Sequence, residues 1–101
     1  MSKKRSDREP GPAPRRHEIE LTRAAERGLS ALPKAVLKRV DAAILALADD
    51  PHPPGSRKLQ GVDDLFRVRV GDYRIIYRVE ENRLVIVVVN VGNRRDIYRS
   101  L

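Results

Sequence analysis

A glycine–aspartate pair, Gly71-Asp72, is the sequence feature that most narrows the folds open to this chain. Gly-Asp is typical of a two-residue turn between antiparallel strands. The stretches on either side, 65–70 and 73–79, are rich in β-branched and aromatic residues. A two-residue turn fixes the register of a hairpin, because a slip of one residue moves every side chain to the opposite face. The sequence therefore predicts which residues share each face.

The predicted register separates apolar residues from arginines. One face holds three apolar pairs across the two strands: Val70 with Tyr73, Val68 with Ile75, and Phe66 with Tyr77. The opposite face holds Arg69 directly across from Arg74, with Arg67 and Arg78 farther along the same strands. Like charges that face each other destabilise a sheet. We therefore expect this second face to lie near carboxylates or to bind an anion.

Two explanations of the arginines are open at this stage. In the structural one, Asp72 and the pair Asp63-Asp64 neutralise them. In the functional one, the face binds phosphate groups, which arginine recognises with a planar, two-pronged set of donors that lysine lacks. We favour the phosphate-binding interpretation, because it accounts for the choice of arginine and for the apolar residues between the charges.

The first half of the chain predicts a helical hairpin that covers the apolar face. Thr22 is a favoured N-cap for a first helix, and Pro33 both ends this helix and begins the next. The second helix, over 34–48, carries apolar residues at helical spacing, and the proline-rich segment 49–55 ends it. The apolar sides of both helices need a partner, and the predicted sheet supplies one.

Two further strands complete the expected sheet. Residues 16–21 alternate as a short edge strand, and residues 84–91 follow a two-residue turn at Glu81-Asn82. The last strand directs three apolar side chains toward the helices: Leu84, Ile86 and Val88. We therefore expect an α+β fold, in which an N-terminal strand and a helical hairpin pack with an antiparallel sheet of three to four strands.

Length and composition limit the organisation of the chain. The 101 residues have room for one domain, which we place at 16–101, after a basic tail at 1–15 that contains proline and glycine. The absence of cysteine excludes disulfides and thiolate chemistry. The longest apolar run, Leu84–Val89, is too short to span a membrane, and the N-terminus has no apolar segment. We expect a cytoplasmic protein.

The net charge of +7 predicts a polyanionic partner, either nucleic acid or an acidic protein segment. Residues 57–101 contain ten basic and six acidic side chains, and nine of the ten are arginine. The sequence has no glycine-rich phosphate loop, no metal-ligand motif and no Ser-His-Asp set, and we interpret His17 and His52 as structural. The chemistry left open is phosphoryl transfer stabilised by guanidinium groups, without metal or cofactor, with Tyr98 as a candidate proton carrier.

Three stretches of the chain together resemble the RelE/ParE toxin superfamily. They are Arg57-Lys58-Leu59-Gln60-Gly61, residues 65–77 around the Gly71-Asp72 turn, and residues 91–98, which read Val-Gly-Asn-Arg-Arg-Asp-Ile-Tyr. The resemblance covers 16–101 and implies the toxin of a type II toxin–antitoxin pair. RelE-like members cleave mRNA in the ribosomal A site after docking on 16S rRNA, whereas ParE-like members inhibit DNA gyrase.

The resemblance also implies roles for individual residues. It implies Arg74, Arg94 and Tyr98 as the catalytic residues of an endoribonuclease. It further implies five RNA-binding residues: Arg57, Lys58, Arg67, Arg69 and Arg95. Asn93 departs from the pattern, because relatives often carry histidine or lysine there, and this removes one candidate proton donor.

The match at the catalytic positions favours the RelE-like branch. The partners that it implies are a small acidic antitoxin, the ribosome and mRNA. Two alternatives stay open at this point: a ParE-like inhibitor of gyrase, and an inactive relative that only binds its antitoxin.

Overall fold

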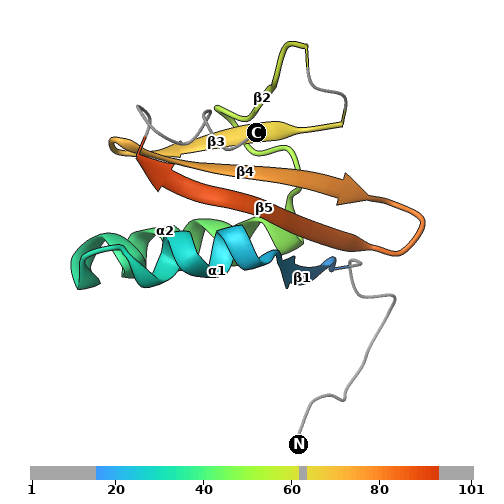
Figure 1. Cartoon of the computed structure of the whole chain (residues 1–101). Coiled ribbons are helices and arrows are strands. Elements are labelled where there is room, and N and C mark those ends of the chain that lie inside the picture. The colour runs from blue at the N-terminus through green and yellow to red at the C-terminus, as the bar shows by residue number, and fades with distance from the viewer. Residues whose placement is uncertain (1–15, 62–63, 94–101) are drawn as a thin grey trace, which may run out of the picture.

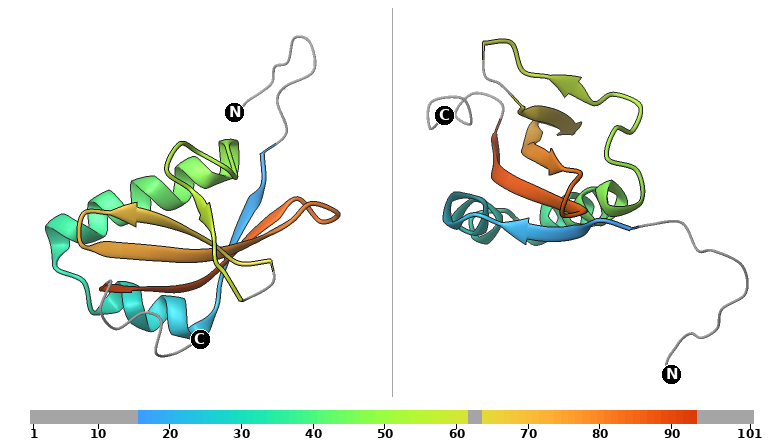
Figure 2. Two further views of the ribbon diagram at one scale, coloured as in Figure 1. Left: turned by 90° about the horizontal axis from the view of Figure 1, so that it is seen from above. Right: turned by 90° about the vertical axis from the view of Figure 1, so that its right-hand side faces the viewer.

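The computed structural model describes residues 16–61 and 64–93, and this part of the chain forms one five-stranded sheet with two helices (Figure 1). The elements are β1 (Glu18–Leu21), α1 (Arg23–Ser30), α2 (Lys34–Asp49), β2 (Arg57–Lys58), β3 (Phe66–Val70), β4 (Tyr73–Glu80) and β5 (Val85–Asn93). Both helices lie on one side of the sheet, as the views in Figure 2 also show. The predicted α+β class is confirmed. No helix in the described part is long and apolar enough to cross a membrane.

The β3–β4 hairpin has the predicted register. Val70 pairs with Tyr73 across the turn, and Arg69 pairs with Arg74. Gly71 has a φ of 61°, a left-handed conformation that glycine adopts without a steric penalty. Alternation along both strands therefore sends apolar side chains to the helices and arginines to the opposite face, as expected.

The main core lies between the helices and the sheet. Its buried members come from both layers: Ala25, Val40, Ile44, Leu47, Ile75, Tyr77, Ile86, Val88 and Val91. Tyr77 is fully buried, and its hydroxyl donates to the Pro51 carbonyl at 2.6 Å and lies 2.7 Å from the Ser56 hydroxyl. Burial raises the pKa of the Tyr77 phenol, which keeps it a donor. The hydrogen bonds of the Tyr77 hydroxyl attach the proline-rich loop after α2 to β4.

The sheet differs from the expected one in two respects. Its strand order is β1-β5-β4-β3-β2, and β1 pairs with β5 in parallel, so the sheet is mixed and not wholly antiparallel. The direction of β1 could not be predicted, because alternation of side chains is the same in parallel and antiparallel strands. A tight turn would have indicated antiparallel pairing, but both helices and three strands lie between β1 and β5. The fifth strand, β2, pairs with β3 but has two residues, which is too short for a periodic signal.

The second hairpin turn is longer than predicted. It spans residues 81–84, not Glu81-Asn82 alone, and Leu84 lies in this turn with a φ of 52° instead of starting the strand. The longer turn moves the register of β5 by two residues, and such a shift keeps Ile86 and Val88 on the helix side.

An ion-pair network lies at this longer turn. Arg83 Nη1 lies 2.6 Å from Glu80 Oε1, and Arg83 Nη2 lies 2.9 Å from Glu20 Oε2 on β1. Arg78 Nη2 approaches Glu80 Oε2 at 2.9 Å. Hydrogen bonds from Arg78 and Arg83 lower the pKa of the Glu80 carboxyl. The turn thus holds β1 beside β5 through Arg83.

Helix α1 approaches β5 closely at one glycine. A Cβ atom at Gly28 would overlap the carbonyl oxygen of Val91, so the helix backbone rests directly on the strand. At the start of the same helix, Thr22 accepts the Ala25 N–H at 3.1 Å as N-cap and donates its hydroxyl to the Val89 carbonyl at 2.6 Å. Both ends of α1 are therefore fixed against β5.

Substitution of Gly28 by alanine should destabilise the fold although alanine favours helices. The added methyl group must push α1 away from Val91, and overpacking of this kind costs about 1–3 kcal/mol. Urea unfolding followed by circular dichroism measures the loss. Ser30→Ala, on the exposed side of α1, is the control and should change stability by less than about 0.5 kcal/mol. Equal stability of Gly28→Ala and the native chain would contradict the close approach.

Candidate functional site

The sheet face turned away from the helices gathers arginines from three strands. Arg57 of β2 pairs with Arg67 of β3, and Arg69 of β3 pairs with Arg74 of β4. Gly92 of β5 pairs with Arg74 at the edge of β4 opposite β3. We refer to the side of the sheet that bears Arg57, Arg67, Arg69 and Arg74 as the arginine face. Gly92 therefore presents no side chain next to Arg74.

An apolar floor lies among these cations. A second buried cluster, separate from the main core, contains Leu65 and Ile76, and Leu59 and Val89 pack against it. Ile76 pairs with Arg67 in the register, so this floor belongs to the arginine face. It places buried apolar side chains beside the arginines of this face.

The carboxylate explanation of the arginine face lacks support in the described part of the chain. Within residues 16–61 and 64–93, Arg57, Arg67 and Arg69 form no ion pair, with either Asp64 or Asp72 or any other carboxylate. Asp63 lies outside the described residues. Arg78, the fourth arginine of the predicted hairpin face, is instead neutralised by Glu80. The arginine face is therefore strongly cationic.

The structure brings together some of the predicted site residues and separates one. Arg57 joins Arg67, Arg69 and Arg74 because β2 adds to the edge of the sheet. Lys58 pairs with Phe66, whose side chain faces the helices, so alternation places Lys58 on the opposite side from the arginines. The remaining predicted residues, Arg94, Arg95 and Tyr98, lie outside the described residues, as does the tail at 1–15.

Two residues of the arginine face were not predicted from the sequence, Asn90 and Gly92. A β-bulge in β5 brings them there: Tyr77 pairs with Val88, but Ile76 pairs with Asn90. Asn90 is buried, with 8% of its surface exposed. Its position opposite Ile76, one row from Arg74 and Gly92, makes it a polar neighbour of the cations. The sequence signal was the interruption of an apolar run by asparagine and glycine.

The two histidines have structural contacts. His17 Nε2 lies 2.7 Å from Glu81 Oε1, and the His52 ring packs edge-on against Phe66 with centroids 4.9 Å apart. In the described ranges, no group of three His, Asp or Glu side chains could hold a metal ion. The histidines therefore do not contribute to the arginine face.

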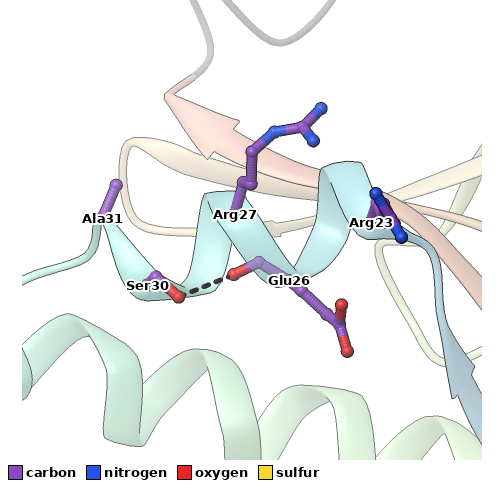
Figure 3. Close-up of a pocket in the computed structure, with 5 residues that line it drawn as sticks. All are labelled: Arg23, Glu26, Arg27, Ser30 and Ala31. Carbon is purple, nitrogen blue, oxygen red and sulfur yellow. Dashed lines mark hydrogen bonds between the residues drawn. The ribbon is translucent and has the colours of Figure 1, made fainter.

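Two of the hollows among the described residues lie beside the helices, away from the arginine face. One is open and follows the outer side of α1 (Figure 3), lined by Arg23, Glu26, Arg27, Ser30 and Ala31. Its one hydroxyl is engaged, because Ser30 donates to the Glu26 carbonyl at 3.0 Å. The other is a groove of about 290 Å³ between β1 and both helices, lined by Ile19, Leu21, Leu29, Asp41, Ile44 and Leu45. We call it the apolar groove.

Comparison with known proteins gives consistent matches over most of the chain. Residues 19–98 match the family model of the ParE toxin of the type II toxin–antitoxin system, parDE. The chain is 31% identical over 87 residues to a RelE-like toxin protein of Escherichia coli, with 82% of this chain and 90% of the relative covered. It is 32% identical over 82 residues to Toxin RelG of Mycobacterium tuberculosis, with 80% and 94% covered.

A solved structure has the same fold. The toxin–antitoxin complex RelBE2 from Mycobacterium tuberculosis contains a chain with a TM-score of 0.71 to this one. The two are 26% identical, and the match covers 81% of this chain and 95% of the other.

Removal of one opposed arginine should not weaken the fold. Arg69→Gln relieves the repulsion from Arg74 across the hairpin, so we expect stability to rise by about 0.2–1 kcal/mol at low salt. Urea unfolding at low and high salt measures the gain, which should shrink as salt screens the charges. Lys58→Gln, on the opposite side of the sheet, is the matched control and should show no gain. A loss of stability in Arg69→Gln would reveal a stabilising partner for Arg69.

Proposed function

This chain belongs to the RelE/ParE superfamily of type II toxins, and we propose that it is a ribosome-dependent endoribonuclease that cleaves mRNA in the A site. It is the toxin of a RelBE-type toxin–antitoxin system. The observation that carries the proposed endoribonuclease activity is the arginine face. Its Arg57, Arg67 and Arg69 have no ion-pair partner in the described part of the chain, as a phosphate-binding surface requires.

The chemistry that this face supports is phosphoryl transfer without a metal. The ribose 2′-hydroxyl gives up its proton to water as its oxygen attacks the adjacent phosphorus. The new O–P bond forms while the P–O5′ bond breaks, and the leaving 5′-oxygen takes a proton from water, so that the products are a 2′,3′-cyclic phosphate and a 5′-hydroxyl. Negative charge grows on the phosphate oxygens in the transition state, where preorganised guanidinium groups stabilise it. In this proposal Arg74 and Arg94 stabilise that charge, while Arg57, Arg67, Arg69 and Arg95 hold the flanking backbone and Tyr98 orients the nucleotide.

A second candidate function is supported by the matched family model, whose description names the ParE toxin. A ParE-like toxin inhibits DNA gyrase and leaves mRNA intact. The arginine face would then be a docking surface and not a nuclease site. The RelE-like names of the two curated relatives favour the nuclease.

Replacement of Arg74 by alanine should strongly reduce cleavage while the fold remains. The loss of one preorganised donor to the transition state lowers the rate by about 10²–10³-fold. Primer extension on mRNA in a reconstituted translation reaction, with a ribosome-free control, measures cleavage, and circular dichroism measures folding. Lys38→Ala, an exposed cation of α2, should cleave like the native chain.

The same assay separates the two candidate functions. Cuts that occur within A-site codons and only with ribosomes support the nuclease. Intact mRNA, together with DNA breaks when gyrase is added, would replace it by gyrase inhibition. Undiminished cleavage by Arg74→Ala would remove Arg74 from the site.

We also propose that a small acidic antitoxin covers this chain. The solved relative is a toxin–antitoxin complex, and the cationic arginine face favours an acidic partner. Two large apolar side chains of the described residues are exposed, Leu21 at 39% and Leu45 at 58%, and both line the apolar groove. An apolar segment of the antitoxin would bury them.

A charge placed in the apolar groove should weaken antitoxin binding without affecting cleavage. For Leu45→Glu we expect at least a tenfold loss of affinity for the cognate antitoxin, about 1.4 kcal/mol, because the carboxylate must be desolvated. Isothermal titration calorimetry measures the affinity. Ala46→Glu adds the same charge at the next residue, which does not line the groove, and serves as the control. Equal affinities of the two variants would place the antitoxin elsewhere.

A further inference from the structure

The β-bulge in β5 is held by contacts from two sides. Val89 is the extra residue, and its carbonyl accepts the Thr22 hydroxyl at 2.6 Å from the start of α1. The Val91 N–H donates to Oδ1 of Asn90 at 2.9 Å, and the Val91 carbonyl lies against Gly28 of α1. A bulge disrupts the ladder and leaves backbone groups that need other partners. Here Thr22 and Asn90 supply them.

The bulge changes which residues of β5 reach the arginine face. Before it, Ile86 and Val88 face the helices, so uninterrupted alternation would send Asn90 and Gly92 into the main core. After it, Val91 enters the core, while Asn90 pairs with Ile76 and Gly92 with Arg74. The bulge therefore places a residue without a side chain opposite Arg74.

Asn90 is well suited to maintain this geometry. Its side-chain oxygen is engaged by the Val91 N–H, one residue before Gly92. Burial leaves 8% of the residue exposed, so its side chain is confined. A buried asparagine among valines is otherwise unfavourable, and the five residues before it, from Val85 to Val89, are all apolar.

We propose that Asn90 is a positioning residue of the arginine face: its side chain holds the bulged end of β5 so that Gly92 lies beside Arg74 and leaves room there for a phosphate of RNA. Asn90 acts through the backbone of Val91 and Gly92 and not by contact with the reacting atoms. Bulges recur beside functional sites for this purpose, since they re-aim side chains. The inference rests on the proposed function for the identity of the ligand, but its geometry concerns any phosphodiester.

The experiment is an NMR titration of the full-length, ¹⁵N-labelled chain with a short oligouridylate RNA, followed at the backbone amides of Arg74 and Gly92. The native chain should show saturable shifts at both amides. Asn90→Ala removes the acceptor for the Val91 N–H, so we expect the Gly92 signal to move in the free protein and RNA affinity to fall at least tenfold. Asn82→Ala, in the exposed turn before β5, is the matched control and should behave like the native chain.

A second variant distinguishes positioning from stability. Asn90→Asp retains an oxygen acceptor for Val91, so it should restore the Gly92 signal of the free protein and the urea midpoint. Its carboxylate, one row from Arg74 on the same face, should still weaken RNA binding, whereas Asn82→Asp should not. If Asn90→Ala does not fold, Asn90→Asp is used instead, and the test is made on the Gly92 signal of the free protein and on RNA affinity.

The outcomes that overturn the inference are distinct. Native RNA affinity in folded Asn90→Ala, or a Gly92 signal that RNA does not move in the native chain, would overturn it. Oligouridylate binding needs no ribosome, so a failure of A-site cleavage leaves this titration unchanged. The two proposals can therefore fail separately.

Discussion

The register of β3 and β4 is the constraint on which the arginine face depends. The turn at Gly71 holds Arg69 opposite Arg74, and alternation then commits the intervening apolar residues to the helices. A slip of one residue would bury these arginines beneath α1 and α2, where unpaired charge is strongly unfavourable. The hydrophobic core and the cationic surface are therefore two consequences of one pairing. Burial of the apolar side chains and exposure of the arginines therefore favour the same register.

The sequence predicted those features that local chemistry determines. The N-cap at Thr22, the break at Pro33 and the turn at Gly71 each use a residue with a specific backbone role, and each was found as expected. The features missed from the sequence depend on tertiary contacts. The parallel direction of β1 carries no local signal, and the turn at residues 81–84 contains Arg83, which pairs with the distant Glu20 on β1.

The candidate site shows the same division between local and tertiary determinants. The hairpin arginines could be placed on one face from alternation alone, and β2 then added Arg57 to them. Lys58 was grouped with Arg57 by sequence proximity, but neighbouring residues of a strand point to opposite faces. Asn90 and Gly92 were missed because a bulge inverts alternation, and this bulge depends on Thr22, distant in sequence by 67 residues from Val89. Sites built on opposed like charges sacrifice some stability, which is typical of functional surfaces.

The pairing of β1 with β5 has a consequence for the order of events during synthesis. Strand β1 can pair only after β5, which spans Val85–Asn93, has been synthesised. Until then β1 has no neighbour in the sheet, α1 lacks the strand on which Gly28 rests, and no glycine lies beside Arg74. A nascent chain can form its helices and its first hairpin early, because their contacts are local. The complete cationic surface therefore exists only after β5 has been synthesised, and a translation product truncated before β5 lacks it.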